Sequence, residues 1–421
     1  MEQKQYQQII RILNQELVPA LGCTEPIAIA YASAKAREVL GTMPEHITAR
    51  CSGNIIKNVK GVIVPSTGNM RGIETSAVLG AVAGNADAKL EVLESVTEED
   101  VAKTKEYLEQ HICDVALIPN GANLQIIIEA KAGKEQVEVE IRDQHTNIVR
   151  IQKNGKILLK KNVQEGKEAQ VPVCSLTLQE IYEFANEVNI ADVREVLDRQ
   201  IQYNTEIADE GLMNRYGANV GKTILKNYGN DVKNMAKAYP AAGSDARMGG
   251  CMKPVVINSG SGNQGMTVSL PVIVYAKYLK VPKEKLYRAL VLSNLVAIHL
   301  KSGIGKLSAY CGAVSAACGS GAAITYLHGA PLPVIEKTIT NTIGNVSGMV
   351  CDGAKSSCAA KIASAVDAAI MGHYMAMDDN TFCAGEGLVK EDVEKTIETV
   401  STMGREGMRQ TDAEILELMI Q

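Results

Sequence analysis

The sequence contains no tryptophan and only two phenylalanines, and aromatic residues make up 4% of its 421 positions. Its core must therefore be built from Ala, Val, Leu, Ile and Met, because large rings are too few to fill it. The net charge is −5 and no run of Lys and Arg occurs, which argues against nucleic-acid binding. A hydrophobic content of 46% and a charged content of 22% are ordinary for a globular protein.

Signals for secretion and membrane insertion are also lacking. The first ten residues, MEQKQYQQII, are polar and show no apolar core of a signal peptide. Residues 307–327 carry no charge, but they are too rich in Gly, Ser, Cys and Ala for a helix that faces lipid. Ten cysteines without a secretion signal indicate reduced thiols and metal binding, not a disulfide framework. We expect a cytoplasmic protein.

Two short segments hold two cysteines each: YCGAVSAACG (310–319) and VCDGAKSSCAAK (350–361). Both are rich in small residues. Six residues separate the members of each pair, so on one continuous helix the two thiols would lie about 10 Å apart along the axis. The cysteines are Cys311, Cys318, Cys351 and Cys358.

Asp352-Gly353 predicts a turn, with a helix that starts near Ala354. Cys351 would then lie in a loop and Cys358 in the first turns of the helix, whose positive end stabilises thiolates. The spacing alone leaves a metal site and packed core cysteines both open.

The segment VPALGCTEP predicts a second helix start. Thr24 suits an N-cap, Pro26 suits the first turn, and the helix should run to about Leu40. Cys23 would precede this N-terminus, where the pKa of a thiol falls, with Glu25 beside it. A packed cysteine at a helix entry is the alternative.

The chain resembles the iron–sulfur L-cysteine desulfidase family, which is related to the α domain of bacterial iron–sulfur L-serine dehydratases. The resemblance rests on the two cysteine segments and on LGCTEP (21–26), and it runs from that motif nearly to the C-terminus. It implies a [4Fe–4S] cluster held by Cys311, Cys351 and Cys358, whereas Cys318 matches a non-ligating cysteine.

The resemblance also implies that Cys23 is a catalytic acid/base residue. The serine enzymes have a longer spacing between the last two ligands and a different N-terminal half, so L-serine is the less favoured substrate. A cluster held by three cysteines leaves one iron open, and this iron can act as a Lewis acid.

Between residues 46 and 174 the predicted secondary structure changes from helical to mixed. Short β-rich runs such as ITARCSG, LQIIIEA and VEVEIRD appear, with hairpin signals at Ala132-Gly133 and Asn154-Gly155. Helical patterns dominate from Leu176 onward.

We therefore predict an α+β fold in which a mainly helical catalytic body carries an inserted mixed α/β domain. The helical, cluster-binding domain comprises 1–45 and 175–421. The α+β domain comprises 46–174 and contributes a substrate-binding loop. Residues 163–180 are predicted to form a linker.

Two polar loops are candidates for substrate binding. In PSTGNMRG the amides and the Arg71 guanidinium could hold a carboxylate, although a simple strand-to-helix turn is the alternative. SGSGNQG could form an anion-binding nest. The candidate residues are Ser66, Thr67, Gly68, Asn69, Arg71, Ser259, Gly260, Ser261, Gly262, Asn263 and Gln264.

The second loop also resembles the substrate loop of pyridoxal-phosphate lyases, which keeps a pyridoxal-phosphate-dependent amino-acid lyase as an alternative. Such an enzyme needs a Schiff-base lysine in a Gly/Ser-rich context upstream. The nearest upstream lysines, Lys222, Lys226, Lys233 and Lys237, lie in charged helical contexts.

The resemblance implies an enzyme, an L-cysteine desulfidase that acts on a small amino acid, and the sequence predicts that it binds neither nucleic acid nor membrane. An L-serine dehydratase and a non-catalytic relative are the other candidates, and no spacing typical of zinc is present. Whether the chain forms a homo-oligomer is left open. The roles of His299, Lys301, Lys355 and His373 are also open, as is whether Cys383 is a fourth ligand.

Overall fold

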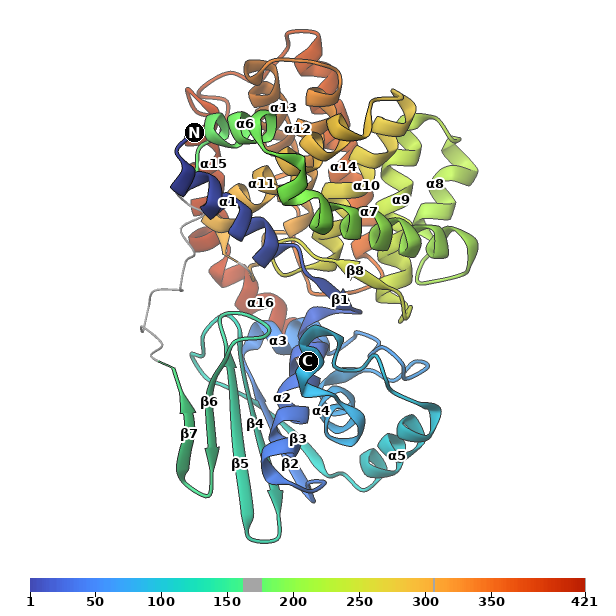
Figure 1. Ribbon diagram of the computed structural model, residues 1–421, viewed down its shortest axis with the longest axis vertical. Coiled ribbons are helices and arrows are strands. Elements are labelled where there is room, and N and C mark those ends of the chain that lie inside the picture. Colours follow the sequence, from blue (N-terminus) through green and yellow to red (C-terminus); the bar gives the residue numbers. More distant parts are fainter. Residues whose placement is uncertain (162–175, 306, 421) are drawn as a thin grey trace.

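The computed structural model describes residues 1–161, 176–305 and 307–420. It has two lobes, one built on a six-stranded sheet and the other mainly helical (Figure 1). This confirms the predicted α+β class with a mainly helical body. Within the described ranges, no helix has both the length and the apolar character needed to cross a membrane.

The sheet has the strand order β3-β2-β4-β5-β6-β7, and only β2 and β3 run parallel. Hairpins were predicted at Gly133 and Asn154-Gly155, and these residues have φ of 56°, 50° and 78°, as tight hairpin turns require. The strands are β2 (His46–Cys51), β3 (Cys113–Leu117), β4 (Gln125–Ala132), β5 (Glu135–Arg142), β6 (Ile148–Lys153) and β7 (Lys156–Lys160).

Helices α2 (Thr24–Leu40) and α4 (Gly72–Ala83) cover one face of this sheet (Figure 1). They cross closely because Gly80 lies against the backbone of Ala30, where an added Cβ would lie 2.3 Å from the carbonyl oxygen. The buried side chains of α2 share one hydrophobic cluster with those of the sheet. The lobe also contains α3 (Gly53–Val59), η1 (Ala86–Glu91) and α5 (Glu98–Glu109).

The domain division predicted from the sequence stays a prediction. Because α2 packs with the sheet, its position argues for a boundary before residue 24 and not at residue 45. Residues 163–175 of the predicted linker (163–180) lie outside the described residues. The predicted domain boundary at 174/175 also falls there.

In the helical lobe, α12 (Gly312–Leu327) packs against four other helices, and all its residues from Ala313 onward are buried. Gly319 allows close approach to α11, since an added Cβ would lie 2.3 Å from the carbonyl oxygen of Ser293. Small residues therefore take the place of the missing aromatic rings by letting helices pack closely.

The helical lobe contains the following helices, given in chain order. They are α1 (Gln3–Glu16), α6 (Leu178–Glu187), α7 (Ile190–Met213), α8 (Val220–Tyr228), α9 (Val232–Met248), α10 (Gly262–Tyr278), α11 (Lys283–Ile304), α12, α13 (Leu332–Val346), α14 (Cys358–Met377), α15 (Val393–Thr402), the π-helical η3 (Met403–Gly407) and α16 (Arg409–Ile420).

Two pairs of secondary-structure elements are among the contacts that join the lobes. Strands β1 (Pro19–Leu21) and β8 (Pro254–Val256) pair antiparallel, so the chain passes from α1 through β1 into α2. Helix α16 packs against α3 at the same junction (Figure 1).

Candidate active site at the junction of the two lobes

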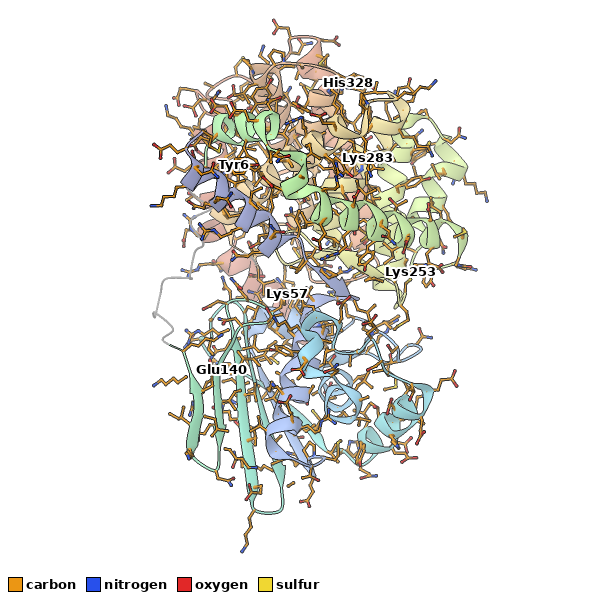
Figure 2. All side chains as sticks on the ribbon, in the orientation of Figure 1. Tyr6, Lys57, Glu140, Lys253, Lys283 and His328 are labelled. Carbon is orange, nitrogen blue, oxygen red and sulfur yellow. The ribbon has the colours of Figure 1, made fainter. Side chains whose placement is uncertain are left out.

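A pocket lies at this junction, and its empty volume, open solvent included, is about 730 Å³. Both lobes line it, and Figure 2 shows Lys57 of α3 between them. The lining side chains that carry chemistry are Cys23, Glu25, Lys57, Asn58, Arg247, Ser261, Asn263, Gln264, Lys301, Cys311, Cys351, Cys358 and Lys361.

Four long helices begin at the pocket wall. Cys23 is the N-cap of α2, Ser261 that of α10 and Cys311 that of α12, while α14 begins at Cys358. The N-terminal end of a helix carries a partial positive charge and unpaired N–H groups. The arrangement therefore favours anions inside the pocket.

Cys311 and Cys351 are held side by side by their backbones. The Cys311 N–H donates to the carbonyl of Met349 at 3.1 Å, and the Cys351 N–H donates to that of Ala309 at 2.6 Å. Burial raises the pKa of the Cys311 thiol, and the nearby Cys351 thiol raises it further. Forty residues of sequence thus separate two thiols that are neighbours in space.

Cys358 completes the group of three. Its sulfur accepts a hydrogen bond from the Lys355 N–H at 3.4 Å and lies 3.6 Å from the carbonyl oxygen of Gly353. Gly353 has φ of 96°, but the chain forms bends at 354–355 and a turn at 356–357, later than the turn predicted at Asp352-Gly353. The helix accordingly starts at Cys358, four residues later than predicted.

Several cations surround these thiols. Lys301 is 3% exposed, and burial lowers its pKa while the thiols of Cys351 and Cys311 oppose that shift. The other two lysines of the pocket have carboxylate partners: Lys57 pairs with Asp412 of α16, and Lys361 pairs with Asp352.

Cys23 packs in one small cluster with Cys358, and its thiol donates to Glu25 Oε2 at 3.4 Å. Glu25 Oε2 also accepts from Thr24 Oγ1 at 3.1 Å, and its Oε1 accepts from Asn58 Nδ2 at 3.0 Å. His145 Nε2, from the turn between β5 and β6, lies 3.9 Å from Oε1. The carboxylate is therefore held from α2, from α3 and from the sheet.

The pKa of Cys23 departs from the sequence expectation. A helix N-terminus was expected to lower it, but burial and the charge of Glu25 raise it, with Arg247 opposing. Burial alone would also raise the pKa of Glu25; His145 and Arg247 hold it at about 2. Without substrate, the pocket therefore holds a Cys23 thiol beside a Glu25 carboxylate.

The loop at 259–264 delivers part of its predicted set to the pocket. Ser261, Asn263 and Gln264 line it, and Asn263 Oδ1 accepts a hydrogen bond from Arg247 Nη1 at 3.1 Å. Ser259 and Gly260 form the turn behind them, with φ of 50° and 80°. Gly262 starts α10 against Arg247, where an added Cβ would lie 2.5 Å from Nε.

The structure does not bring the other predicted loop to this pocket. Thr67 Oγ1 closes the loop locally by donating to the carbonyl of Val64 at 2.6 Å and accepting from the Met70 N–H at 3.1 Å. The residues concerned are Ser66, Thr67, Gly68, Asn69 and Arg71, none of which lines the pocket. Their substrate-binding role stays a prediction without support from this geometry.

Other candidates from the sequence also lie elsewhere. His299 pairs with Glu394 at 2.8 Å, and His373 hydrogen-bonds to Thr325 at 2.9 Å inside the helical lobe. Cys383 is exposed in a loop. Lys355 does not line the pocket, and neither do the four lysines upstream of the 259–264 loop.

Sequence reasoning missed Arg247, Lys57 and Asn58 as pocket residues. Lys57 and Asn58 lie in CSGNIIKNVKGVIVPSTGNMRG (51–72), a stretch rich in Gly and Asn, but toward its opposite end from PSTGNMRG. Arg247 lies in the last turn of α9, and no motif in the sequence marks it as a pocket residue.

A family model described as the serine dehydratase alpha chain matches residues 87–417, and the chain belongs to this family. The family is typically associated with iron–sulfur clusters, and membership indicates a lyase-type enzyme.

Similar chains occur in several bacteria, each named as a UPF0597 protein. The relative from Lachnoclostridium phytofermentans is 56% identical over 415 residues, which cover 99% of this chain and 100% of the relative. That from Desulfitobacterium hafniense is 50% identical, with 100% and 98% covered. That from Treponema denticola is 48% identical, with 100% and 99% covered.

Proposed function

We propose that the protein is a [4Fe–4S]-dependent L-cysteine desulfidase, a carbon–sulfur lyase that converts L-cysteine to pyruvate, ammonia and hydrogen sulfide. The observation that carries the proposal is the meeting of Cys311, Cys351 and Cys358 in one pocket that helix N-termini surround. The proposal includes a cytoplasmic location, since thiolate ligands need a reducing compartment.

The donor set fits a cluster better than a single ion. Among the described residues, no three His, Cys, Asp or Glu side chains are grouped to hold one metal ion. In a cluster, each thiolate binds a different iron, so the three sulfurs need not converge on one point. Helix N-termini and the buried Lys301 would offset the negative charge that three thiolates bring.

When bound, the cluster would supply a Lewis-acidic, thiophilic iron for the sulfur leaving group. The chain's own residues would do the rest. Ser261, Asn263 and Gln264 would orient the substrate at the start of α10. Cys23 would take part in the proton transfer at Cα, and Glu25, whose Oε2 accepts the hydrogen bond of the thiol, would orient it. The released aminoacrylate then hydrolyses to pyruvate and ammonia.

Two other functions have specific support. The family description favours an iron–sulfur L-serine dehydratase, whose leaving group is a hydroxyl. One observation supports a pyridoxal-phosphate lyase. The amine of Lys301 is buried, and burial lowers its pKa, as a Schiff-base lysine requires. Three cysteines in the same pocket favour the cluster over pyridoxal phosphate.

Anaerobic purification followed by iron and acid-labile sulfide analysis tests the cofactor. About four irons per chain, with release of sulfide and pyruvate from L-cysteine, are expected. Turnover of L-serine alone would move the protein to the dehydratase branch. An iron-free chain with pyridoxal absorbance and full activity would overturn the proposal.

A further inference from the structure

Arg247 is a buried cation that forms no direct ion pair with a carboxylate among the residues that the structure describes. It is 3% exposed and lines the pocket from the end of α9. Its Nε donates to the carbonyl of Gly22 at 2.9 Å, and its Nη1 donates to Asn263 Oδ1 at 3.1 Å. A guanidinium has five N–H groups, so these two bonds leave donors available. A buried charge without an ion-pair partner calls for an anion.

The carboxylates near the pocket are already engaged. Glu25 accepts hydrogen bonds from Cys23, Thr24 and Asn58 and forms no ion pair with Arg247 among the described residues. Asp352 and Asp412 pair with lysines. Arg247 lowers the pKa of Glu25 through its charge, but no carboxylate among the described residues contacts its guanidinium directly. A bound anion would supply that contact.

Two buried side-chain oxygens complement this cation. Gln264 Oε1 and Asn58 Oδ1 line the same pocket, and neither has a hydrogen-bond partner among the described residues. Gln264 is 6% exposed and Asn58 is 7% exposed. Leaving a buried acceptor unpaired is costly, so both oxygens call for a donor.

Gln264 also lies against the cysteine side of the pocket. An added Cβ at Gly312, the residue after Cys311, would lie 2.6 Å from Gln264 Cδ. Whatever binds between Arg247 and Gln264 therefore lies beside the thiols.

We propose that Arg247 binds the carboxylate of an α-amino acid, and that Gln264 and Asn58 accept hydrogen bonds from its α-ammonium group. The pocket then recognises the zwitterion, and the amino-acid side chain is left to the cysteine side. The inference rests on the proposed function for its substrate class, but it assigns residues and a selectivity that can be measured without turnover.

The test uses L-alanine, which carries the zwitterion without a leaving group, and two analogues that each lack one charge. L-lactate has no ammonium group and ethylamine has no carboxylate. Binding is measured by calorimetry and by the shift in melting temperature, on the iron-free chain and on the reconstituted protein. L-alanine should bind at least about 10-fold more tightly than either analogue, because each analogue leaves buried polar groups unpaired.

Substitutions locate the two contacts. Arg247→Gln should weaken L-alanine binding by at least about 30-fold, because it removes one partner of a buried charge pair. Gln264→Met should weaken it by about 10-fold and reduce the preference for L-alanine over L-lactate. Arg199→Gln, on the surface of α7, is the matched control and should bind L-alanine as the wild type does.

Arg247→Lys is a second variant that separates loss of binding from a folding defect. It keeps the positive charge but loses the paired N–H donors of the guanidinium. A folded Arg247→Lys or Arg247→Gln variant that binds L-alanine like the wild type would overturn the inference. So would equal binding of the three ligands, or no L-alanine binding to either form of the wild type. If L-alanine binds as expected but L-cysteine is not turned over, the proposed desulfidase activity fails and the zwitterion site stands.

Discussion

The pocket has two walls that differ in chemistry and in origin. The cysteine wall (Cys311, Cys351 and Cys358) comes from the helical lobe and lies inside the 87–417 match to the serine dehydratase alpha chain. The N-terminal wall (Cys23, Glu25 and Asn58) comes from α2, its N-cap and α3, outside that match. Under the proposed function, the part matched by the family model holds the cofactor and the substrate carboxylate, and the N-terminal part contributes proton transfer and a contact to the substrate ammonium group.

The walls also treat their thiols differently. Cys311 and Cys358 lie near the cations Lys301 and Lys361, whereas Cys23 lies beside the carboxylate of Glu25. A positive surrounding favours a thiolate and a negative one favours a thiol. This difference supports the proposed metal ligation on one wall and the proposed proton transfer on the other.

The largest expected effect comes from the cysteine wall. Cys351→Ser should lose most of the bound iron and lower activity on the order of 1,000-fold, because the Lewis acid is lost with its ligand. Iron, acid-labile sulfide and visible absorbance are the measurements. Cys318→Ser is the matched control, since Cys318 is buried in α12 but does not line the pocket. A colourless Cys351→Ser variant with full turnover would refute the assignment.

The N-terminal wall should separate chemistry from cofactor binding. Cys23→Ser should retain the cluster spectrum and lower kcat by about 100- to 10,000-fold, the usual contribution of an acid/base group. Cys251→Ser, at a similarly buried cysteine outside the pocket, should keep its rate. If Cys23→Ser turns over at the wild-type rate, Cys23 is not the proton acceptor.

His145 links the sheet to the N-terminal wall and should have an intermediate effect. His145→Gln removes the imidazole 3.9 Å from Glu25, so burial should raise the pKa of that carboxyl above about 2. A drop in kcat of about 10-fold is expected if the lost stabilisation of the carboxylate, equivalent to about one pKa unit of free energy, adds to the barrier of proton transfer. Profiles of kcat and KM against pH measure it, with KM expected to stay constant. Unchanged kcat at every pH would show that His145 acts only in packing.

Asp245 is a buried charge that belongs to neither wall and should affect stability alone. Its carboxylate accepts from the Gly221 N–H at 3.2 Å, and burial raises its pKa to about 6. Because the folded-state pKa is raised, the contribution of Asp245 to the free energy of unfolding is complete below its unfolded pKa near 4. This contribution is lost as pH rises through 6. Asp245→Asn should remove about 3 kcal/mol of that pH dependence.

Denaturant unfolding of wild type and Asp245→Asn at pH 4 and pH 7 checks this sign. The difference in unfolding free energy between the two chains should move in favour of the variant as the pH rises. A difference that stays constant would mean that Asp245 titrates normally. L-alanine binding should remain, because the neighbouring Arg247 keeps its contacts.

The sequence predicted the α+β class, the hairpins and, to within one residue, the start of α2, whose N-cap is Cys23 and not Thr24, because these depend on local signals such as Asn154-Gly155 and Pro26. It also singled out three cysteines that share a pocket, through the resemblance that their segments carry. Arg247 escaped prediction because its role depends on the approach of Gly22 and Asn263, which is tertiary.

The prediction that the pKa of Cys23 is lowered was wrong for the same reason. A helix N-terminus is a local feature that lowers the pKa of a thiol, but the depth of burial and the position of Glu25 depend on how α2 packs. In this pocket the tertiary contribution is the larger one.

The polar stretch 51–72 offers the smallest predicted effect and the sharpest test of the N-terminal wall. Its start, α3, lines the pocket through Asn58, whereas Arg71 at its end is exposed and its Nη1 lies 3.5 Å from the carbonyl of Gly61. Asn58→Ala should raise KM for L-cysteine by about 10-fold, because it removes an acceptor and frees Glu25. Arg71→Gln should change KM by no more than about 2-fold, as expected for a surface residue. If Arg71→Gln raises KM as much as Asn58→Ala does, the loop at 66–71 reaches the substrate in the working enzyme, and the N-terminal wall is larger than the pocket defines.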